Sequence, residues 1–366
     1  MFVNATIVIV IISVLLEIYL FFNFKRFIKS KFILFTIIGI WLLIIGNFGY
    51  NMIFFDRNIG QTQTTMWATG LFMLFGFPRI ILFLVFLIQD IFRGFGWIFN
   101  RITNTKSTED SYLPSRRKFV MISGLSIASI PFLGLLHGMT LGKYNYKVIK
   151  KKLAYNRLPK SFDGFKVLHI TDIHSGSLDN REKIVEAVDL INQQEFDILL
   201  FTGDIVNNFH WEMDRWINVF SKIKKAPYGN YAVLGNHDYG EYTDWKSEED
   251  KQDNFEKIKA IFPQIGMELL LNENRFIEIN GEKIAIVGVQ NWGTRFKKLG
   301  DLEEASKDVS LNDFKILMSH DPSHWNEIVK SDPKHYDLTL SGHTHGMQLG
   351  IEVPKIGLRW NPAHCG

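Results

Sequence analysis

Four long apolar runs occupy the first 142 residues and constrain the fold more than any other feature of the chain. They cover residues 7–24, 32–55, 66–88 and 119–141, and each is near the ~20 residues that a helix needs to cross a hydrocarbon core of ~30 Å. A cleaved signal peptide has a shorter apolar region and would leave the three later runs unexplained. We therefore predict a multi-span α-helical membrane region over 1–142, with about four transmembrane helices.

Three ionisable side chains, Glu17, Arg79 and His137, lie inside these runs. Such groups mark transport pathways in some membrane proteins. Here each is isolated, without a second charge at helical spacing in the same run, which argues against a transporter core. We expect them to reach the interface, to pair between helices or to make polar contacts within the bundle. The third run is the least regular, because Gly76, Pro78 and Arg79 interrupt it.

The distribution of lysine and arginine predicts how these spans are oriented. Segment 25–31 carries four basic residues and no acidic one, loop 56–64 carries one basic residue, and loop 90–118 carries six. This pattern places 25–31 and 90–118 in the cytoplasm of a multi-pass cell-membrane protein, and everything after residue 142 on the extracytoplasmic side. Six further basic residues in 143–157 oppose this orientation.

The rest of the chain is of a different kind, since ten of the eleven histidines lie at 169 and beyond. The formal net charge of the whole chain is +3, so we expect no nucleic-acid partner. Its single cysteine, Cys365, excludes an intramolecular disulfide framework and a metal site built from thiolates. We interpret 143–159 as a basic linker and 160–366 as a separate folded domain.

Short apolar strands alternate with amphipathic helices in this second domain, which is typical of an α/β fold. The predicted strands are 165–170, 197–202, 231–234, 314–319 and 336–341, with a hairpin at 276–289. Acid, amide or imidazole side chains follow each of the five; in chain order the motifs are Asp172-x-His174, Gly203-Asp204, Gly235-Asn236-His237-Asp238, His320 and Gly342-His343-x-His345. Because ligands bind outside the carboxyl ends of strands in open α/β sheets, we expect these motifs to form one site.

The side chains of these motifs indicate the chemistry of the site. Carboxylates, an amide oxygen and imidazoles, without sulfur, suit manganese, iron or zinc. The seven candidate ligands are Asp172, His174, Asp204, Asn236, His320, His343 and His345. This number is too large for one tetrahedral ion and suits two divalent ions that share a carboxylate, an arrangement that clamps phosphate esters and activates water. One such motif alone is more often a capping or surface pair, but the whole set favours a metal centre.

Together the motifs resemble the full signature of the calcineurin-like metallophosphoesterase superfamily, over about 160–350 and with all five blocks in order. The apolar N-terminal region is similar to that of the membrane-anchored bacterial branch with YkuE-type phosphoesterases. The resemblance implies two packed mixed β-sheets flanked by helices, with the metals at the strand ends. Relatives usually continue with further strands after the last motif, whereas 21 residues follow His345 here, so we expect a fold truncated at its C-terminus.

The resemblance also implies a role for each site residue. The ligands would be Asp172, His174 and His345 for one ion, Asn236, His320 and His343 for the other, and Asp204 as the bridge. His237 would be catalytic, approaching the phosphate oxygens or protonating the leaving alkoxide. Asp238 would be its orienting partner.

From these observations we predict a membrane-tethered, metal-dependent phosphoric ester hydrolase. It would use two divalent ions and a metal-activated water to cleave a phosphate ester or pyrophosphate. Tethering next to a bilayer makes a lipid-linked or envelope phosphate an attractive substrate. The alternative is a non-catalytic sensor or scaffold that binds metal or phosphate at the membrane and turns over nothing.

Overall fold

The computed structural model describes residues 2–103, 114–345, 351–353 and 358–360. They form two compact units, residues 1–148 and residues 149–366. The boundary lies inside the segment 143–159 that the sequence assigns to a linker. Each unit has its own core, and each is described by itself.

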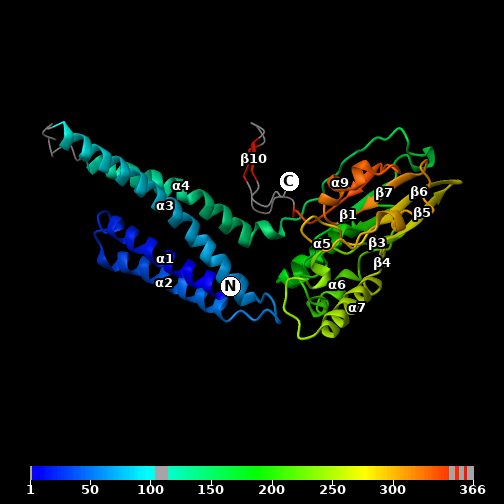
Figure 1. The fold of residues 1–366 in the computed structure, drawn as a ribbon, viewed down its shortest axis with the longest axis horizontal. Coiled ribbons are helices and arrows are strands. Elements are labelled where there is room, and N and C mark those ends of the chain that lie inside the picture. Colours follow the sequence, from blue (N-terminus) through cyan, green and yellow to red (C-terminus); the bar gives the residue numbers. More distant parts are fainter. Residues whose placement is uncertain (1, 104–113, 346–350, 354–357, 361–366) are drawn as a thin grey trace. The chain divides into compact units, whose positions relative to one another are not determined.

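The first unit consists of four long apolar helices (Figure 1). They are α1 (Phe2–Phe24), α2 (Lys31–Ile53), α3 (Gln63–Ile102) and α4 (Pro114–Thr140). Consecutive helices run antiparallel and pack against each other, and α1 also packs against α3. Each helix is long and apolar enough to cross a membrane, which confirms the predicted number of spans.

Helix α3 is more continuous and longer than the sequence indicates. It continues through Pro78 without interruption, because helix-breaking residues are tolerated where neighbouring helices support the backbone. It also extends to Ile102, so the first part of the predicted loop 90–118 is helical. A helix of 40 residues is ~60 Å long, about twice the thickness of a hydrocarbon core. Its C-terminal part, which carries Asp90, Arg93 and Arg101, therefore projects beyond a single span.

An ion pair between helices joins α1 to α3. The Nε atom of Arg79 donates to Oε2 of Glu17 at 3.1 Å, and only 11% and 4% of the two side chains are exposed. The guanidinium also lies over the ring of Trp41, 4.4 Å from the ring centroid. An unpaired charge at this depth would be costly, so each partner compensates the other. The expectation that such groups pair between helices is confirmed for Glu17 and Arg79.

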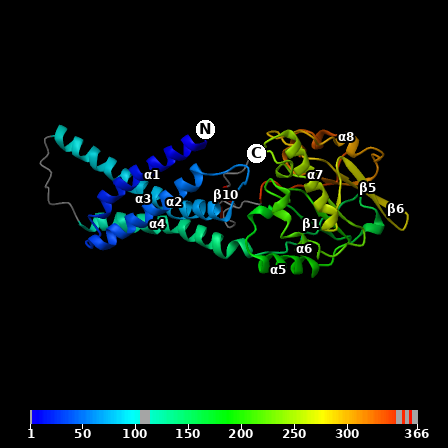
Figure 2. The same cartoon turned by 90° about the horizontal axis from the view of Figure 1, so that it is seen from below.

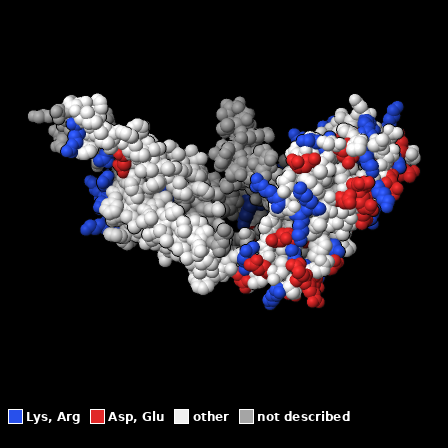
Figure 3. Space-filling model, viewed as in Figure 1, with Lys and Arg blue, Asp and Glu red and all other residues white. Residues whose placement is uncertain are grey.

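The two ends of the helical unit differ in charge. Figure 3 shows basic side chains gathered at the end where α1 turns into α2, while most of the visible helix surface carries no charge. Lys25, Arg26, Lys29 and Lys31 are all exposed there. The connection from α2 to α3, at the other end, has one basic residue, Arg57. This asymmetry is of the kind that orients multi-span proteins during insertion.

The second unit contains two four-stranded sheets and a separate two-stranded pair (Figure 2). The first sheet has the order β1 (Val167–Ile170), β2 (Ile198–Phe201), β3 (Asn230–Ala232) and β4 (Glu268–Leu269), all parallel. The second has the order β5 (Glu273–Ile279), β6 (Glu282–Gly288), β7 (Phe314–Met318) and β8 (Leu338–Leu340), with β5 antiparallel to β6 and the rest parallel. The antiparallel pair is β9 (Ile351–Val353) and β10 (Leu358–Trp360).

Alternation of side chains along the strands builds a four-layer arrangement. Ile198 and Leu200 of β2 face the second sheet and pack with Ile286 of β6. Leu199 and Phe201 of the same strand point the other way, into a core shared with the helices that cover the first sheet. The helices of this unit are α5 (Arg181–Asn192), α6 (Ile217–Phe220), α7 (Glu248–Gln264), α8 (Leu302–Ala305) and α9 (Ser323–Glu327). The short 3₁₀ turns of this unit are Lys160–Phe162, Ser175–Ser177, His210–Met213, His237–Tyr239 and Val329–Ser331, while Gly142–Tyr144 follows α4 in the first unit.

The predicted strands are all present, as β1, β2, β3, β7 and β8, and the predicted hairpin is β5–β6. The two packed sheets are confirmed, although only the second is mixed within its described strands. Strand β4 escaped prediction because two residues are too few to show a period. The expected truncation falls on the segment after His345, of which the structure describes only residues 351–353 and 358–360.

The ion pair between α1 and α3 yields a first prediction. Replacing the acid, Glu17→Gln, leaves the Arg79 guanidinium buried without a counter-charge, and we expect it to cost about 3–5 kcal/mol of stability. Unfolding of the purified full chain by SDS titration from mild detergent measures this loss. The double variant Glu17→Met/Arg79→Met should recover most of it, because it removes both charges. A single variant as stable as the wild type would contradict the structural importance of the pair.

Candidate metal centre

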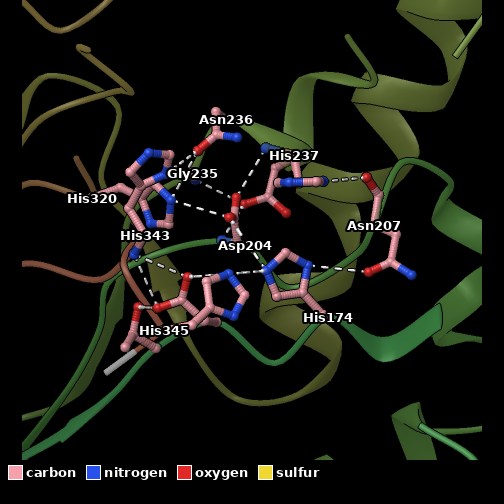
Figure 4. A network of polar contacts seen from close by, with 12 residues as sticks. His174, Asp204, Asn207, Gly235, Asn236, His237, His320, His343 and His345 are labelled. Carbon is pink, nitrogen blue, oxygen red and sulfur yellow. Dashed lines mark hydrogen bonds and ion pairs between the residues drawn. The ribbon is translucent and has the colours of Figure 1, made fainter. Parts of the chain in front are cut away.

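The five motifs meet at one edge of the second unit, where the carboxyl ends of strands from both sheets lie together (Figure 4). Hydrogen bonds cross from one sheet to the other at this edge. The backbone N–H of His343, after β8, donates to Oδ1 of Asp172, after β1, at 2.9 Å. The Nδ1 atom of His320, after β7, donates to the carbonyl of Thr202, after β2, at 2.7 Å. The predicted convergence of the motifs therefore rests on direct contacts between the two sheets.

Most of the candidate ligands adopt the left-handed backbone conformation, which non-glycine residues rarely do. The φ angles are 53° for Asp172, 46° for His174, 59° for Asp204, 69° for His343 and 52° for His345. Each such residue costs on the order of 1–3 kcal/mol, and such strain is typical of functional sites. The surrounding contacts impose this backbone, which turns the side chains toward a common centre.

Two glycines let the strand ends approach each other closely. Gly203 has φ 94°, and a Cβ atom at this position would collide with the backbone of Gly235. A Cβ atom at Gly342 would collide with the side chains of Thr171 and Asp172. The Gly-Asp and Gly-His pairs of the sequence therefore reflect close approach of the backbone at the site.

The carboxylate of Asp204 lies at the centre of the site and is fully buried. Its Oδ1 accepts the backbone N–H of His237 at 2.9 Å. Its Oδ2 lies 3.1 Å from Nε2 of His320 and 3.5 Å from Nε2 of His174, and no hydrogen bond of acceptable geometry reaches it from the described residues. Burial raises the pKa of Asp204, but the nearby histidine charges outweigh burial and hold the pKa below its usual range. A buried anionic oxygen of this kind requires a cation beside it.

A first group of donor atoms lies on one side of Asp204. The Nε2 atoms of His174 and His345 are 3.2 Å apart. Oδ1 of Asp172 lies 3.7 Å from Nε2 of His345. Together with Asp204, these three residues offer donor atoms that all lie within 4.8 Å of one another. Burial lowers the pKa of His174 to about 4, although the charge of Asp204 opposes this. The neutral imidazole of His174, whose Nε2 lies beside that of His345, is suited to bind a metal ion.

A second group lies on the other side and shares the same carboxylate. It consists of Asp204, His320 and His343, again with donor atoms within 4.8 Å of one another. The side-chain oxygen of Asn236 lies 3.1 Å from Nε2 of His320 and 2.8 Å from Nδ1 of His343. Burial lowers the pKa of His320, but the charge of Asp204 more than offsets this and raises it to about 9. A proton and a metal ion therefore compete for this histidine.

His237 and Asp238 take different places from those expected. The Nδ1 atom of His237 donates to the backbone carbonyl of Asn207 at 2.7 Å, and not to Asp238. The buried carboxylate of Asp238 accepts four backbone N–H groups, from Asp204, Ile205, Val206 and Gly235, at 2.9 to 3.3 Å. Burial and the charge of Asp204 raise the pKa of Asp238 to about 7. The expected orientation of His237 by Asp238 is therefore wrong: Asp238 binds the backbone of two loops that carry candidate ligands.

Three further residues support the candidate ligands and were not predicted. Oδ1 of Asn207 accepts from Nδ1 of His174 at 3.1 Å. The hydroxyl of Tyr242 accepts from the side chain of Asn236 at 2.7 Å. Oδ2 of Asp321 lies 3.8 Å from Nε2 of His343, one of the candidate ligands. Partners of this kind orient metal ligands. All three follow a motif closely in the chain, but polar residues are common in loops, so their positions carried no clear signal.

Comparison with known proteins agrees with this arrangement. The profile of the family described as "Calcineurin-like phosphoesterase" matches residues 165–347, which is half of the chain. The chain belongs to the calcineurin-like metallophosphoesterase family. A second profile, "Probable Calcineurin-like phosphoesterase, transmembrane domain", matches residues 3–143. Both parts of the predicted resemblance are therefore confirmed, and the first unit is the membrane domain of such a protein.

Several bacterial metallophosphoesterases are similar to this calcineurin-like chain. YkoQ of Bacillus subtilis is 30% identical over 190 residues, which are 51% of this chain and 63% of YkoQ. YkuE of the same organism is 29% identical over 205 residues, 55% of this chain and 64% of YkuE. A metallophosphoesterase of Aquifex aeolicus is 32% identical over 212 residues, 56% of this chain and 72% of that protein. The chain thus spans less than two thirds of the length of YkoQ and of YkuE.

The contacts of Asp238 in this metallophosphoesterase domain yield a second prediction. Asp238→Asn replaces an acceptor with an amide donor that faces backbone N–H groups, and we expect a loss of about 1–3 kcal/mol in the free energy of unfolding. Urea unfolding of the purified full chain, followed by circular dichroism, measures this loss. The control Asp253→Asn, on the exposed surface of α7, should change stability by at most about 0.5 kcal/mol. Unchanged stability in Asp238→Asn, together with lost activity, would restore the catalytic role first expected.

Proposed function

We propose that this protein hydrolyses a phosphate ester or pyrophosphate with the help of two divalent metal ions. One observation carries the proposal: the buried Oδ2 of Asp204 is unsatisfied, and two separate groups of donor residues converge on this carboxylate. A single ion would leave one group without a cation. The family to which the chain belongs supports a metal-dependent phosphoric ester hydrolase.

The donor set fits the expected ions. Asp172, His174 and His345 would hold one ion, and Asn236, His320 and His343 the other, with Asp204 between them. Oxygen and imidazole donors without sulfur suit manganese, iron or zinc. When bound, two such ions stabilise the charge that develops on the phosphoryl oxygens and lower the pKa of a water nucleophile.

His237 is the residue of this chain best placed to handle a proton. Its Nδ1 is engaged by the Asn207 carbonyl, which leaves Nε2 as the atom that exchanges a proton with a leaving oxygen. Its ring is stacked on that of Tyr242, with the centroids 4.2 Å apart, and lies edge-on to His174 at 4.7 Å. These contacts fix the imidazole beside the first group of candidate ligands.

We further propose that the substrate is a lipid-linked or envelope phosphate at the extracytoplasmic face of the cell membrane. The membrane domain keeps the phosphoesterase domain next to a bilayer, which favours substrates anchored there. The four basic residues of 25–31 favour the cytoplasm for that end of the helices. Four spans then return the chain to the outer side before the phosphoesterase domain begins.

Catalysis is tested with the purified full chain in detergent, bis-p-nitrophenyl phosphate and manganese. We expect hydrolysis that a chelator abolishes and that added manganese restores. Asp204→Asn should lower kcat/KM about 100-fold or more and reduce the bound metal, because the shared ligand loses its charge. The control Asp189→Asn, exposed on α5, should keep both. Full activity in Asp204→Asn would exclude the mechanism, and bound metal without hydrolysis of any ester would favour the sensor or scaffold.

Sidedness is tested with cysteines in a Cys365→Ser background. Lys222→Cys lies on the exposed surface of the phosphoesterase domain, and Lys29→Cys lies in the exposed turn between α1 and α2. In intact cells a membrane-impermeant maleimide should label the first variant and not the second, while both should react after the cells are opened. The reverse pattern would place the phosphoesterase domain in the cytoplasm.

A further inference from the structure

A pocket of about 380 Å³ opens beside the second group of candidate ligands. The lining residues used here are Asn236, Glu241, Tyr242, Asn291, Arg295, Phe296 and Lys297. Its volume is in the range of small-molecule sites. Of the lining residues named here, only Asn236 belongs to one of the five motifs, so the motifs did not predict this pocket.

The inner wall of the pocket is continuous with the candidate metal centre. Asn236 turns its oxygen toward His320 and His343, and its nitrogen donates to the hydroxyl of Tyr242 at 2.7 Å. The ring of Phe296 lies edge-on to His343, with the centroids 5.1 Å apart. A group attached to a phosphate held by the candidate ligands would therefore extend into this pocket.

The outer wall carries more positive than negative charge. Arg295 and Lys297 are both exposed and lie two residues apart on the same loop. One acid, Glu241, also lines the pocket, and its Oε1 is shared by Lys297 at 2.7 Å and Lys251 at 2.8 Å. The lining thus has two basic residues and one acid, and Lys251 outside it also compensates that acid, so this wall attracts an anion.

A buried acceptor without a partner lies in the same lining. Asn291 is only 2% exposed, and its side-chain oxygen receives no hydrogen bond from the described residues. The backbone carbonyl of Asn291 accepts the N–H groups of Leu299 and Gly300 at 3.0 and 3.1 Å, which closes the loop that carries the two exposed cations. Buried acceptors are normally satisfied, so this oxygen is suited to a hydroxyl or N–H group of a ligand.

We propose that this pocket binds a second phosphate group of the substrate, which makes the domain selective for compounds with two linked phosphates over those with one. The first phosphate lies at the candidate metal centre. The second is held by Arg295 and Lys297, and a hydroxyl- or N–H-bearing part of the molecule meets Asn291. This inference rests on the proposed function for the position of the first phosphate, and it deepens that function by naming the substrate class.

The test compares two probes that differ by one phosphate, uridine 5′-diphosphate and uridine 5′-monophosphate. Their dissociation constants are measured by isothermal titration calorimetry on the full chain in detergent with manganese. We expect the diphosphate to bind about ten-fold more tightly, as one or two charge-assisted contacts predict. In Arg295→Gln and Lys297→Gln this ratio should fall toward one. Both residues are exposed, so the variants are expected to fold.

Lys298→Gln is the matched control. This lysine is the next residue in the chain and is also exposed, but its ammonium lies over the ring of Trp292, 4.7 Å from the centroid. The ratio should stay at its wild-type value in this variant. A wild-type ratio near one, or an equal fall in Lys298→Gln, would overturn the inference.

Hydrolysis of bis-p-nitrophenyl phosphate by the same preparations separates the two proposals. Hydrolysis with a ratio near one would contradict the pocket assignment and leave the proposed function standing. A ratio of about ten that depends on Arg295 and Lys297, without any hydrolysis, would support the pocket and contradict the catalytic function.

Discussion

The buried carboxylate of Asp204 is the constraint on which the rest of the phosphoesterase domain depends. Its side chain is out of contact with water and touches groups that follow strands of both sheets. An anion in such a place is stable only if cations or protonated histidines surround it. The left-handed backbone of His174, His343 and His345 turns three imidazoles toward this point, and four backbone N–H groups compensate the neighbouring carboxylate of Asp238. The edge that carries the candidate ligands is strained and polar because that charge must be matched.

The membrane domain also contains buried charges that need compensation, although its surroundings are a bilayer. Within α1 and α3 the charges of Glu17 and Arg79 compensate each other directly, since neither water nor lipid tails would do so. Elsewhere the helices expose apolar side chains and keep their basic residues at one end. A chain with these two units combines a bilayer anchor with a site whose donors suit divalent cations. Both units therefore follow from the cost of a charge in a medium of low dielectric constant.

The success of sequence reasoning depended on how local each signal was. The strands before Asp172, Asp204 and Asn236 were predictable because apolar runs and the polar residues after them are adjacent in the chain. The place of Asp238 was not, because its carboxylate binds backbone groups 32 to 34 residues earlier, and its neighbour His237 suggested a simpler partner. The length of α3 was missed because Asp90 and Arg93 interrupt the continuous apolar run, although Ile91, Phe95, Ile98 and Ile102 continue it at helical spacing.

The sequence by itself determined the four apolar helices, the order of the strands and the identity of the residues that meet at the strand ends. Local patterns of hydrophobicity and polarity are sufficient for this, because each pattern involves only residues that are close together in the chain. The tertiary structure decided which atoms of those residues face one another, which histidine nitrogens are engaged, and that a pocket with Arg295 and Lys297 adjoins the site. These features arise from contacts between residues far apart in the chain, such as His343 with Asp172, and no local pattern encodes them.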